Sequence, residues 1–261
     1  RQVLSVWGSD IFLFPSRSFI HRHILRFVLS RADYLCSTSR AMADEARKYT
    51  AKQFFITPFG VDTGKYKPLT PPHCRPTIGT IKGLDVVYGI DTLLHAFALL
   101  KRRNVSVGPL VIGGDGPERN KLLLLASRLG IEKEVEFLGR VPQTEVPRQL
   151  NRLTVFLALS RSESFGVAVL EALACGVPAV VTAVGGLPEV VQHGVTGFVV
   201  PPENPVAAAE AVERLLQDKE LYDRMSKNAR SFVQSNFEWQ KSFNVMKALY
   251  GRILAEHSTR E

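Results

Sequence analysis

Residues 163–171 read ESFGVAVLE, and the apolar stretch ALACGVPAVVTAVGG follows directly at 172–186. Apolar residues recur at helical spacing over Gly166–Cys175, and Ala179–Thr182 is a short, fully apolar run typical of a buried strand. A helix that leads into such a strand is typical of a parallel sheet whose two faces are both covered by helices. The stretch therefore predicts an α/β fold.

Strands and helices alternate on both sides of this stretch. The predicted strands are Thr77–Ile81, Leu110–Ile112, Val135–Leu138, Val155–Ala158, Ala179–Thr182 and Gly197–Val200. The predicted helices are Ile90–Lys101, Arg119–Leu129, Glu145–Leu150, Gly166–Cys175, Gly186–His193, Pro205–Gln217, Leu221–Gln234 and Trp239–Glu256. In sheets of this kind ligands bind outside the carboxyl ends of the strands, so function is sought in the loops that follow the strands.

A shorter set of elements precedes the proline-rich segment KPLTPPHCRP at 67–76, which lacks periodicity and predicts a linker. This set contains predicted strands at Val3–Trp7, Tyr34–Ser37 and Gln53–Thr57, a basic amphipathic helix at Ile20–Arg31, and a helix from a Ser39 cap to Lys48. We therefore divide the chain into residues 1–70, 71–236 and 237–261.

The 261 residues are 45% hydrophobic and 22% charged, which excludes a disordered or fibrous protein. The net charge is +8, and residues 1–67 carry +6 of it, because eleven Lys and Arg stand against five acids there. A basic region of this kind is typical of proteins that bind an acidic substrate, an anionic membrane surface or nucleic acid. It is equally typical of a solvated surface without a partner. Nucleic acid is the weakest of these partners, since the basic residues are not interleaved with aromatic residues in a recognisable module.

Cys36, Cys74 and Cys175 form no CxxC pair and no cluster with His. This pattern disfavours a disulfide framework and a zinc site, and it favours a reducing compartment. No apolar run approaches the roughly 18 residues that span a bilayer. We therefore expect a cytoplasmic protein without a bound metal.

Two carboxylates bracket the start of the helix predicted after residue 165. Glu163 lies in the loop before the helix, where the positive end of the helix dipole favours negative charge. The free backbone N–H groups of Phe165, Gly166 and Val167 would suit a phosphate oxygen beside it. Glu171 lies among apolar helix residues, and a carboxylate there is costly unless it is hydrogen-bonded, binds a ligand or points to solvent.

Two further loops hold unusual residues. Gly114 belongs to the run GGDGP at 113–117, where glycines either allow close approach of a phosphate or nucleoside or simply make a tight turn. Arg119 stands where the dinucleotide fingerprint requires its third glycine, which disfavours a nicotinamide or flavin cofactor. At the end of the first strand, Trp7 is predicted to fill the core rather than to stack on a sugar or lipid, and Gly8 to line a cleft.

Over Phe156–Pro201 the chain resembles the nucleotide-sugar lobe of the retaining GT-B glycosyltransferases of family 4. The turn GDGP at 114–117, the strand end FLGRV at 137–141 and the segment PFGVD at 58–62 also match motifs of that family, so the resemblance covers nearly the whole chain. It implies a GT-B fold, here with one complete Rossmann-like parallel-sheet lobe and a partial N-terminal Rossmann-like lobe.

The resemblance also implies roles for particular residues. Glu171 would accept hydrogen bonds from the ribose hydroxyls of the donor nucleotide, and Glu163 would contact hydroxyls of the transferred sugar. The backbone of Phe165, Gly166 and Val167 would face the diphosphate of the donor. The main chain of Arg140 and Val141 would contact the base, and the glycine loop at Gly114 would also bind the donor. A carboxylate is well shaped for a vicinal diol, and a helix N-terminus stabilises charge on a leaving diphosphate. No cofactor or divalent metal is implied.

The chain departs from the family in the loop after Thr77–Ile81. The family places an Arg and a Lys there, as G-R-x-x-x-x-K-G, whereas this loop has Lys82 as its only cation and Tyr88 before the glycine. We assign Lys82 to the donor diphosphate and expect both Lys82 and Glu163 to be catalytic residues. The alternative is a solvated lysine.

The resulting expectation is a glycosyltransferase that moves a sugar from a nucleotide-sugar donor, expected to be UDP-linked, to a glycan or lipid-linked acceptor with retention, in polysaccharide or glycolipid biosynthesis. The basic helix at Ile20–Arg31 would then hold the enzyme at the inner face of an anionic membrane. The alternatives are a sugar-nucleotide epimerase of the same fold and a non-catalytic nucleotide-sugar-binding fragment. Because residues 1–70 are short for a whole first lobe, we expect donor binding but poor transfer by this chain alone.

Overall fold

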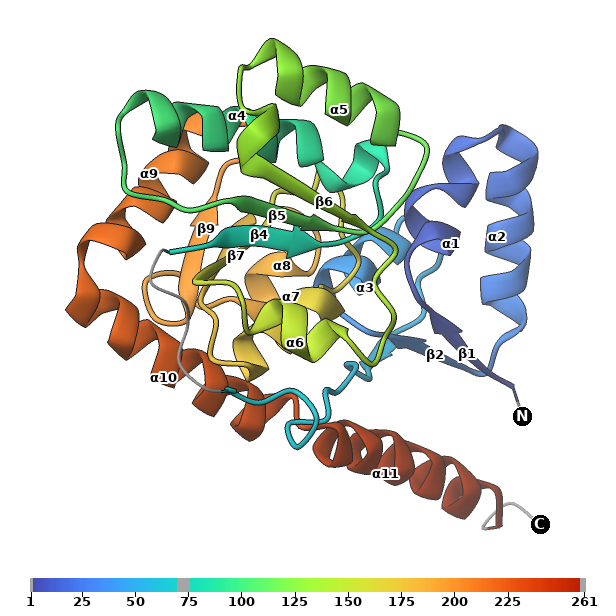
Figure 1. The fold of residues 1–261 in the computed structure, drawn as a ribbon. Helices are drawn as coiled ribbons and strands as arrows, with labels where there is room; N and C mark the ends of the chain where they lie inside the picture. The colour runs from blue at the N-terminus through green and yellow to red at the C-terminus, as the bar shows by residue number, and fades with distance from the viewer. Residues whose placement is uncertain (1, 70–75, 259–261) are drawn as a thin grey trace.

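The computed structural model describes residues 2–69 and 76–258, and it contains two separate parallel sheets (Figure 1). The middle of the predicted linker, including Cys74, lies outside the described residues. The α/β fold with two Rossmann-like lobes is confirmed. We call the part built on the smaller sheet the first lobe and the part built on the larger sheet the second lobe.

The second lobe holds a six-stranded parallel sheet in the order β6-β5-β4-β7-β8-β9. Its strands are β4 (Ile78–Ile81), β5 (Leu110–Gly113), β6 (Val135–Gly139), β7 (Val155–Ala158), β8 (Ala179–Thr182) and β9 (Gly197–Val200). The chain first builds outward from β4 through β5 to β6, then returns to the other side of β4 with β7. This is the doubly wound strand order of dinucleotide-binding folds, in which the direction of winding reverses between the first and fourth strands.

Both faces of this sheet are buried, as the apolar strands predict. In β7, Val155 and Leu157 join one hydrophobic cluster, whereas Phe156 and Ala158 join the other, because successive side chains of a strand point to opposite faces. Figure 1 shows the two layers of helices that cover the faces. The first layer is α4 (Ile90–Arg102), α5 (Arg119–Arg128) and α9 (Pro205–Gln217), and the second is α6 (Val146–Leu150), α7 (Val167–Ala174) and α10 (Lys219–Asn236).

The first lobe is smaller. Its sheet has the order β1-β2-β3 with all strands parallel, and within the described residues β1 pairs with β2 alone and forms an edge. The elements are β1 (Val3–Val6), α1 (Ser9–Phe12), α2 (Phe19–Arg31), β2 (Tyr34–Ser37), α3 (Arg40–Ala46) and β3 (Phe54–Ile56), with a 3-10 turn η1 (Phe14–Ser16) before α2. Ser39 caps α3 as predicted, since its hydroxyl accepts the N–H of Met42 at 3.1 Å.

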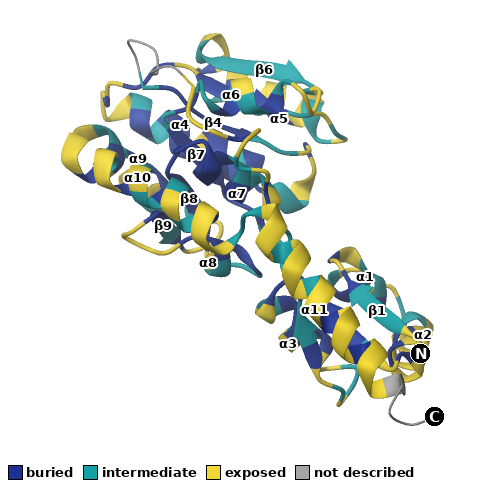
Figure 2. Ribbon diagram, turned by 90° about the horizontal axis from the view of Figure 1, so that it is seen from below, coloured by how far each residue is buried: buried dark blue, intermediate teal, exposed yellow. Residues whose placement is uncertain are grey.

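The last helix, α11 (Trp239–Ser258), leaves the second lobe and lies along the first (Figure 2). Leu249 and Ile253 of this helix cluster with Cys36 of β2, and the hydroxyl of Tyr34 donates to Glu256 at 2.6 Å. The chain thus passes between the lobes twice. The two passages pair with each other, because Val61 donates to the carbonyl of Phe237 at 2.8 Å and accepts from the N–H of Trp239 at 3.1 Å.

Three local expectations are wrong. Trp7 does not fill the core: its side chain is 64% exposed, and its ring packs edge-on against Phe59 at 5.6 Å. The strand ends at Val6 because the Asp10 carboxylate accepts the N–H groups of Trp7 and Gly8 and turns the chain into α1, a helix too short for any periodicity.

The helix predicted at Gly186–His193 is also too long. It is only the four-residue α8 (Leu187–Val190), since Val191 is already extended. The helix predicted at Leu221–Gln234 instead begins earlier, because the Asp218 side chain accepts the N–H of Leu221 and starts α10 at Lys219. Two 3-10 turns, η2 (Val86–Tyr88) and η3 (Glu132–Glu134), complete the described elements. Across residues 2–69 and 76–258, no helix has the length and apolar character needed to cross a membrane.

Candidate functional site

The strand order places the site at the carboxyl ends of β4 and β7. Winding reverses between these two strands, so the loops that follow them diverge and leave a crevice where ligands of doubly wound sheets bind. The loop after β4 carries Lys82, and the loop after β7 carries Glu163. Two residues that the sequence assigned to one site therefore meet at the position that the topology favours for a ligand.

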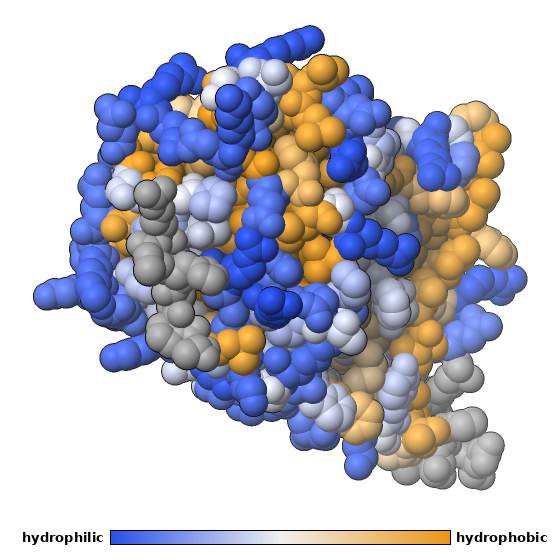
Figure 3. All heavy atoms as spheres, in the orientation of Figure 1, coloured by the Kyte–Doolittle hydropathy of each residue, from blue (hydrophilic) through white to orange (hydrophobic). Residues whose placement is uncertain are grey.

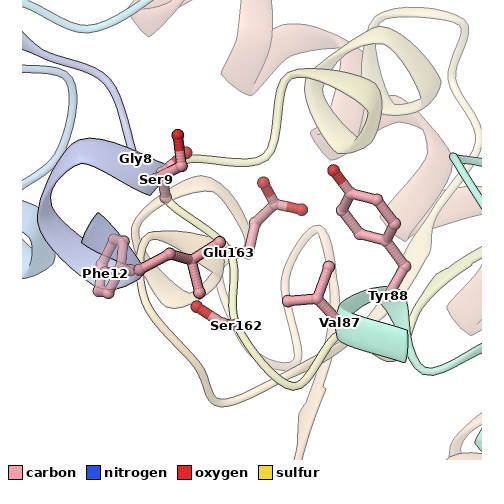
Figure 4. Close-up of a pocket in the computed structure, with 9 residues that line it drawn as sticks. Gly8, Ser9, Phe12, Val87, Tyr88, Ser162 and Glu163 are labelled. Atoms are coloured by element: carbon pink, nitrogen blue, oxygen red, sulfur yellow. The ribbon is translucent and has the colours of Figure 1, made fainter. Parts of the chain in front are cut away.

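A cavity of about 130 Å³ opens at this point between the two lobes. Gly8, Ser9, Phe12 and Leu13 of the first lobe line one side, and Val87, Tyr88, Ser162, Glu163 and Ser164 of the second lobe line the other. Figure 4 shows Glu163 and Tyr88 side by side, facing the α1 segment that carries Gly8 and Phe12. A Cβ on Gly8 would lie 3.1 Å from the Ser164 side chain, so a glycine keeps the two lobes close here.

Lys82 and Glu163 form an ion pair at the second-lobe wall of the cavity. Their side chains are only 12% and 11% exposed, and the Lys82 ammonium also lies 4.6 Å from the centre of the Tyr88 ring. The Lys82 side chain is therefore largely shielded from solvent, and its role toward a donor stays a prediction. A lysine held between a carboxylate and an aromatic face is a cation that a diphosphate can recruit by displacing the carboxylate.

Gly114 serves the fold at this edge. Its φ is +137°, and a Cβ there would lie 1.8 Å from the Lys82 carbonyl oxygen. The N–H of Lys82 donates to the Gly113 carbonyl at 2.9 Å, so the loops after β4 and β5 pack backbone against backbone. Gly114 therefore fixes the position of Lys82, whatever it also does for a ligand.

The side chain of Phe165 anchors the loop that carries Glu163. That ring is 2% exposed and packs edge-on against Phe59 at 5.8 Å and Phe237 at 5.9 Å. The side chain of Phe165 is thus part of the core, and only its backbone remains for a ligand. Gly166, with a φ of +111°, directly precedes α7, which begins at Val167. The backbone N–H groups at the start of α7 point out of the helix.

Glu171 lies one helix turn further along α7. Burial raises the pKa of its carboxyl, and the Tyr66 hydroxyl and the Gln143 amide act against this shift by hydrogen bonding. Gln143 donates to the Tyr66 hydroxyl at 2.7 Å and reaches Glu171 Oε1 at 3.4 Å. The ammonium groups of Lys65 and, to a smaller extent, Lys82 also favour the charged form of Glu171.

Arg140 and Val141 lie along the same edge, after β6. Arg140 lines an open hollow with Asp115 and Gly116, and a Val141 methyl group lies 3.0 Å from where a Cβ of Gly113 would be. The assigned residues thus lie at three places: the interlobe cavity around Glu163, the ends of β5 and β6, and the position of Glu171 beside Tyr66 and Gln143.

Sequence reasoning missed four contributors. Tyr88 lines the cavity and faces Lys82, Ser164 meets Gly8, and Tyr66 and Gln143 contact Glu171. For Gln143 the sequence carries no signal. For Tyr88 the signal was its place before Gly89, where the family has a lysine. Within the described residues no cluster of three His, Cys, Asp or Glu side chains could hold a metal ion, and metal independence stays a prediction.

Two lobes of this construction, with a site at the winding reversal between them, define the GT-B class of glycosyltransferase. A family model described as "Glycosyl transferases group 1" matches residues 66–232, and one described as "Glycosyl transferase 4-like" matches residues 1–39. The chain belongs to the glycosyl transferases group 1 family.

Two curated relatives illustrate the similarity. The N-acetyl-alpha-D-glucosaminyl L-malate synthase of Bacillus anthracis is 40% identical over 97% of this chain and 68% of its own length. The D-inositol 3-phosphate glycosyltransferase of Salinispora tropica is 30% identical over 89% of this chain and 54% of its own length. The chain therefore spans about half to two thirds of the length of these relatives.

Solved structures share the fold. Sucrose-phosphate synthase from Thermosynechococcus elongatus superposes with a TM-score of 0.86 at 26% identity, over 97% of this chain and 68% of that one. Anabaena HepE in complex with UDP-glucose superposes with a TM-score of 0.84 at 22% identity, over 95% of this chain and 72% of that one. The arrangement of both lobes thus recurs in these structures.

Glu171→Gln is expected to stabilise the ligand-free chain at neutral pH. Because burial raises the pKa of Glu171, the folded chain keeps this proton at a pH where the unfolded chain has released it, so stability falls as pH rises from the ordinary value of 4.5 through the raised pKa. A glutamine side chain at this position has no proton to release, so the variant does not lose this stability as pH rises. Thermal melting between pH 4 and 8 should show a gain that shrinks toward low pH, whereas Glu132→Gln, at an exposed turn, should show none. A gain independent of pH would contradict the argument.

Lys82→Ala is expected to weaken the binding of UDP by about tenfold or more and to leave the binding of uridine unchanged. The ammonium is the cation nearest to Glu163, and a charge-assisted contact to a diphosphate is lost with it. Calorimetry with both ligands measures the difference. The matched control is Lys219→Ala, whose side chain is 84% exposed on α10. Equal affinity of wild type and Lys82→Ala for UDP would remove Lys82 from the site.

Proposed function

We propose that this protein transfers a sugar from a UDP-linked donor to a hydroxyl of a glycan or lipid-linked acceptor, with retention of anomeric configuration and without a cofactor or metal. The observation that carries the proposal is the Lys82–Glu163 ion pair at the winding reversal, with Glu171 buried on the helix that follows and hydrogen-bonded by Gln143. UDP-glucose in Anabaena HepE supports a UDP-linked donor. A mannosyltransferase of Mycobacterium tuberculosis, 31% identical, is named as GDP-mannose-dependent, so the nucleotide has to be tested.

The chemistry follows from the residues in place. The Glu171 carboxylate accepts both hydroxyls of the ribose, and Tyr66 and Gln143 hold it in orientation. The donor diphosphate takes Lys82 from Glu163, and the N–H groups at the start of α7 add to the stabilisation of the leaving group. Glu163 is then free to accept from hydroxyls of the sugar. The acceptor hydroxyl enters from the first-lobe side of the cavity. Its oxygen forms a bond to the anomeric carbon of the sugar while the bond from that carbon to the diphosphate oxygen breaks, and its proton passes to the departing diphosphate oxygen.

The direct test is thermal melting of the chain with UDP-, GDP- and ADP-sugars. A ligand that binds only the folded state raises the melting temperature. At a ligand concentration one hundred times its Kd, the free energy of unfolding increases by about 2.7 kcal/mol. We expect the largest rise with a UDP-sugar, unchanged by EDTA. No rise with any nucleotide sugar would refute the proposal, and a rise that EDTA abolishes would refute metal independence.

A second candidate is a chain that binds the donor without transferring the sugar. Donor binding by calorimetry with no release of UDP in the presence of acceptors would support it. An epimerase of the same fold would instead convert a UDP-sugar without any acceptor, which NMR would detect.

We propose further that α2 holds the protein at an anionic membrane that carries a lipid-linked acceptor. Ile20, Ile24, Phe27 and Val28 form an exposed apolar stripe on the helix, and the orange band over α2 at the right of Figure 3 shows it from one side. Phe27 is 59% exposed, and the Arg31 guanidinium lies over its ring at 5.3 Å. Apolar side chains flanked by arginines are typical of helices that lie in the membrane interface.

Sedimentation with lipid vesicles tests this surface. We expect stronger binding to vesicles that contain anionic lipid than to neutral ones, and a loss of this preference in Arg26→Glu, a change on the exposed side of α2. Lys219→Glu on the distant α10 serves as the matched control. Equal binding to neutral and anionic vesicles would refute the proposal that α2 holds the protein at an anionic membrane.

A further inference from the structure

Glu189 spans the gap between the two lobes. It belongs to α8 of the second lobe, yet its Oε1 accepts the N–H of Ala41 at 2.8 Å and its Oε2 accepts the N–H of Arg40 at 2.9 Å. Both N–H groups belong to the first turn of α3 in the first lobe. The Glu189 carboxylate of one lobe therefore caps a helix of the other lobe.

Ser39 makes a second contact at the same helix start. Its hydroxyl accepts from the N–H of Met42 at 3.1 Å and donates to the Ser164 carbonyl of the second lobe at 2.7 Å. The first three N–H groups of α3 lack partners within the helix, and here the second lobe supplies two of their three acceptors. The two hydrogen bonds to Glu189 join a charged carboxylate to the positive end of a helix, which makes them about twice as strong as neutral hydrogen bonds.

The second-lobe side of this contact is rigidly joined to the candidate site. A Cβ on Gly185 would lie 1.7 Å from the Glu163 carbonyl oxygen, and the N–H of Gly186 donates to the same oxygen at 3.0 Å. The segment that carries Glu189 therefore moves with the loop of Glu163. The distance between α3 and α8 in turn sets how closely Ser164 approaches Gly8 across the cavity.

We propose that Glu189 and Ser39 form an interlobe latch that holds the cavity closed, with Glu189 as a positioning residue for transfer. Glu189 does not line the cavity, so it acts through the distance between the lobes. The latch itself rests on the contacts above, whereas its effect on transfer also rests on the proposed function. Its two consequences can therefore be measured separately.

The first measurement is the shape of the full chain in solution. Small-angle X-ray scattering of Glu189→Ala should show a larger radius of gyration than the wild type, and Glu189→Gln, which keeps one acceptor oxygen, an intermediate value. Glu220→Ala, an exposed carboxylate on α10, is the matched control and should change nothing. An unchanged radius of gyration in Glu189→Ala would overturn the latch even if the protein bound no nucleotide.

Ser39→Asp separates the latch from helix capping. An aspartate still accepts the N–H of Met42 and keeps α3 capped, but it has no proton for the Ser164 carbonyl. We expect this variant to open the lobes without loss of helix content by circular dichroism. If Glu189→Ala fails to fold, this variant alone decides, and an unchanged radius of gyration in it would overturn the proposal.

The second measurement separates the donor from the transfer step. All residues assigned to the nucleotide lie in the second lobe, so Kd for UDP should stay within about twofold of wild type in Glu189→Ala while kcat/KM for transfer falls by about tenfold or more, the effect expected of misplaced reacting groups. A parallel loss of UDP affinity and transfer would show that Glu189 acts through the Glu163 loop alone and would overturn the latch. Absence of UDP binding in the wild type would count against the proposed function and leave the scattering result to decide the latch.

Discussion

No side chain fits between the loops that end the central strands of the second lobe, and the candidate site depends on this constraint. A Cβ at Gly114 or Gly185 would overlap a carbonyl oxygen of the neighbouring loop, that of Lys82 in one case and of Glu163 in the other. The two glycines allow these loops to pack in two pairs, backbone against backbone, the loop after β5 with that after β4 and the loop after β8 with that after β7. As a result the two charged residues are held by the main chain rather than by flexible side-chain contacts alone, which is the preorganisation that charge stabilisation requires.

The ligand-free site keeps its charges paired. Lys82 satisfies Glu163, Tyr88 covers the lysine, and Tyr66 and Gln143 offset part of the cost of burying Glu171. A buried charge without a partner would be costly, so this pairing explains how the site exists before a donor arrives. It also means that the donor diphosphate has to replace the Glu163 carboxylate as the partner of Lys82. The free energy gained at Lys82 on binding is then the difference between its contact with the diphosphate and its contact with Glu163.

Much of the fold follows from local patterns, whereas the contacts of the site do not. The apolar run of β7 and the Ser39 cap are short-range features, and both were predictable. Trp7 was misplaced because the Asp10 side chain, three residues away, turns the chain before the ring can enter the core. Lys82 and Glu163 are 81 residues apart and Arg40 and Glu189 are 149 apart, and no spacing rule states which loops touch over such lengths. Gln143 reaches Glu171 from a loop without any pattern.

The path of α11 has a consequence for the order in which the protein is made. Leu249 and Ile253 cover Cys36 on the first sheet, yet they are synthesised long after it, once the strands of the second sheet have been made. At about 5–20 residues per second, the second lobe is complete and able to fold while that face of the first lobe still lacks its cover. This apolar surface of the first lobe therefore stays uncovered until α11 has been made, which is after the strands of the second lobe.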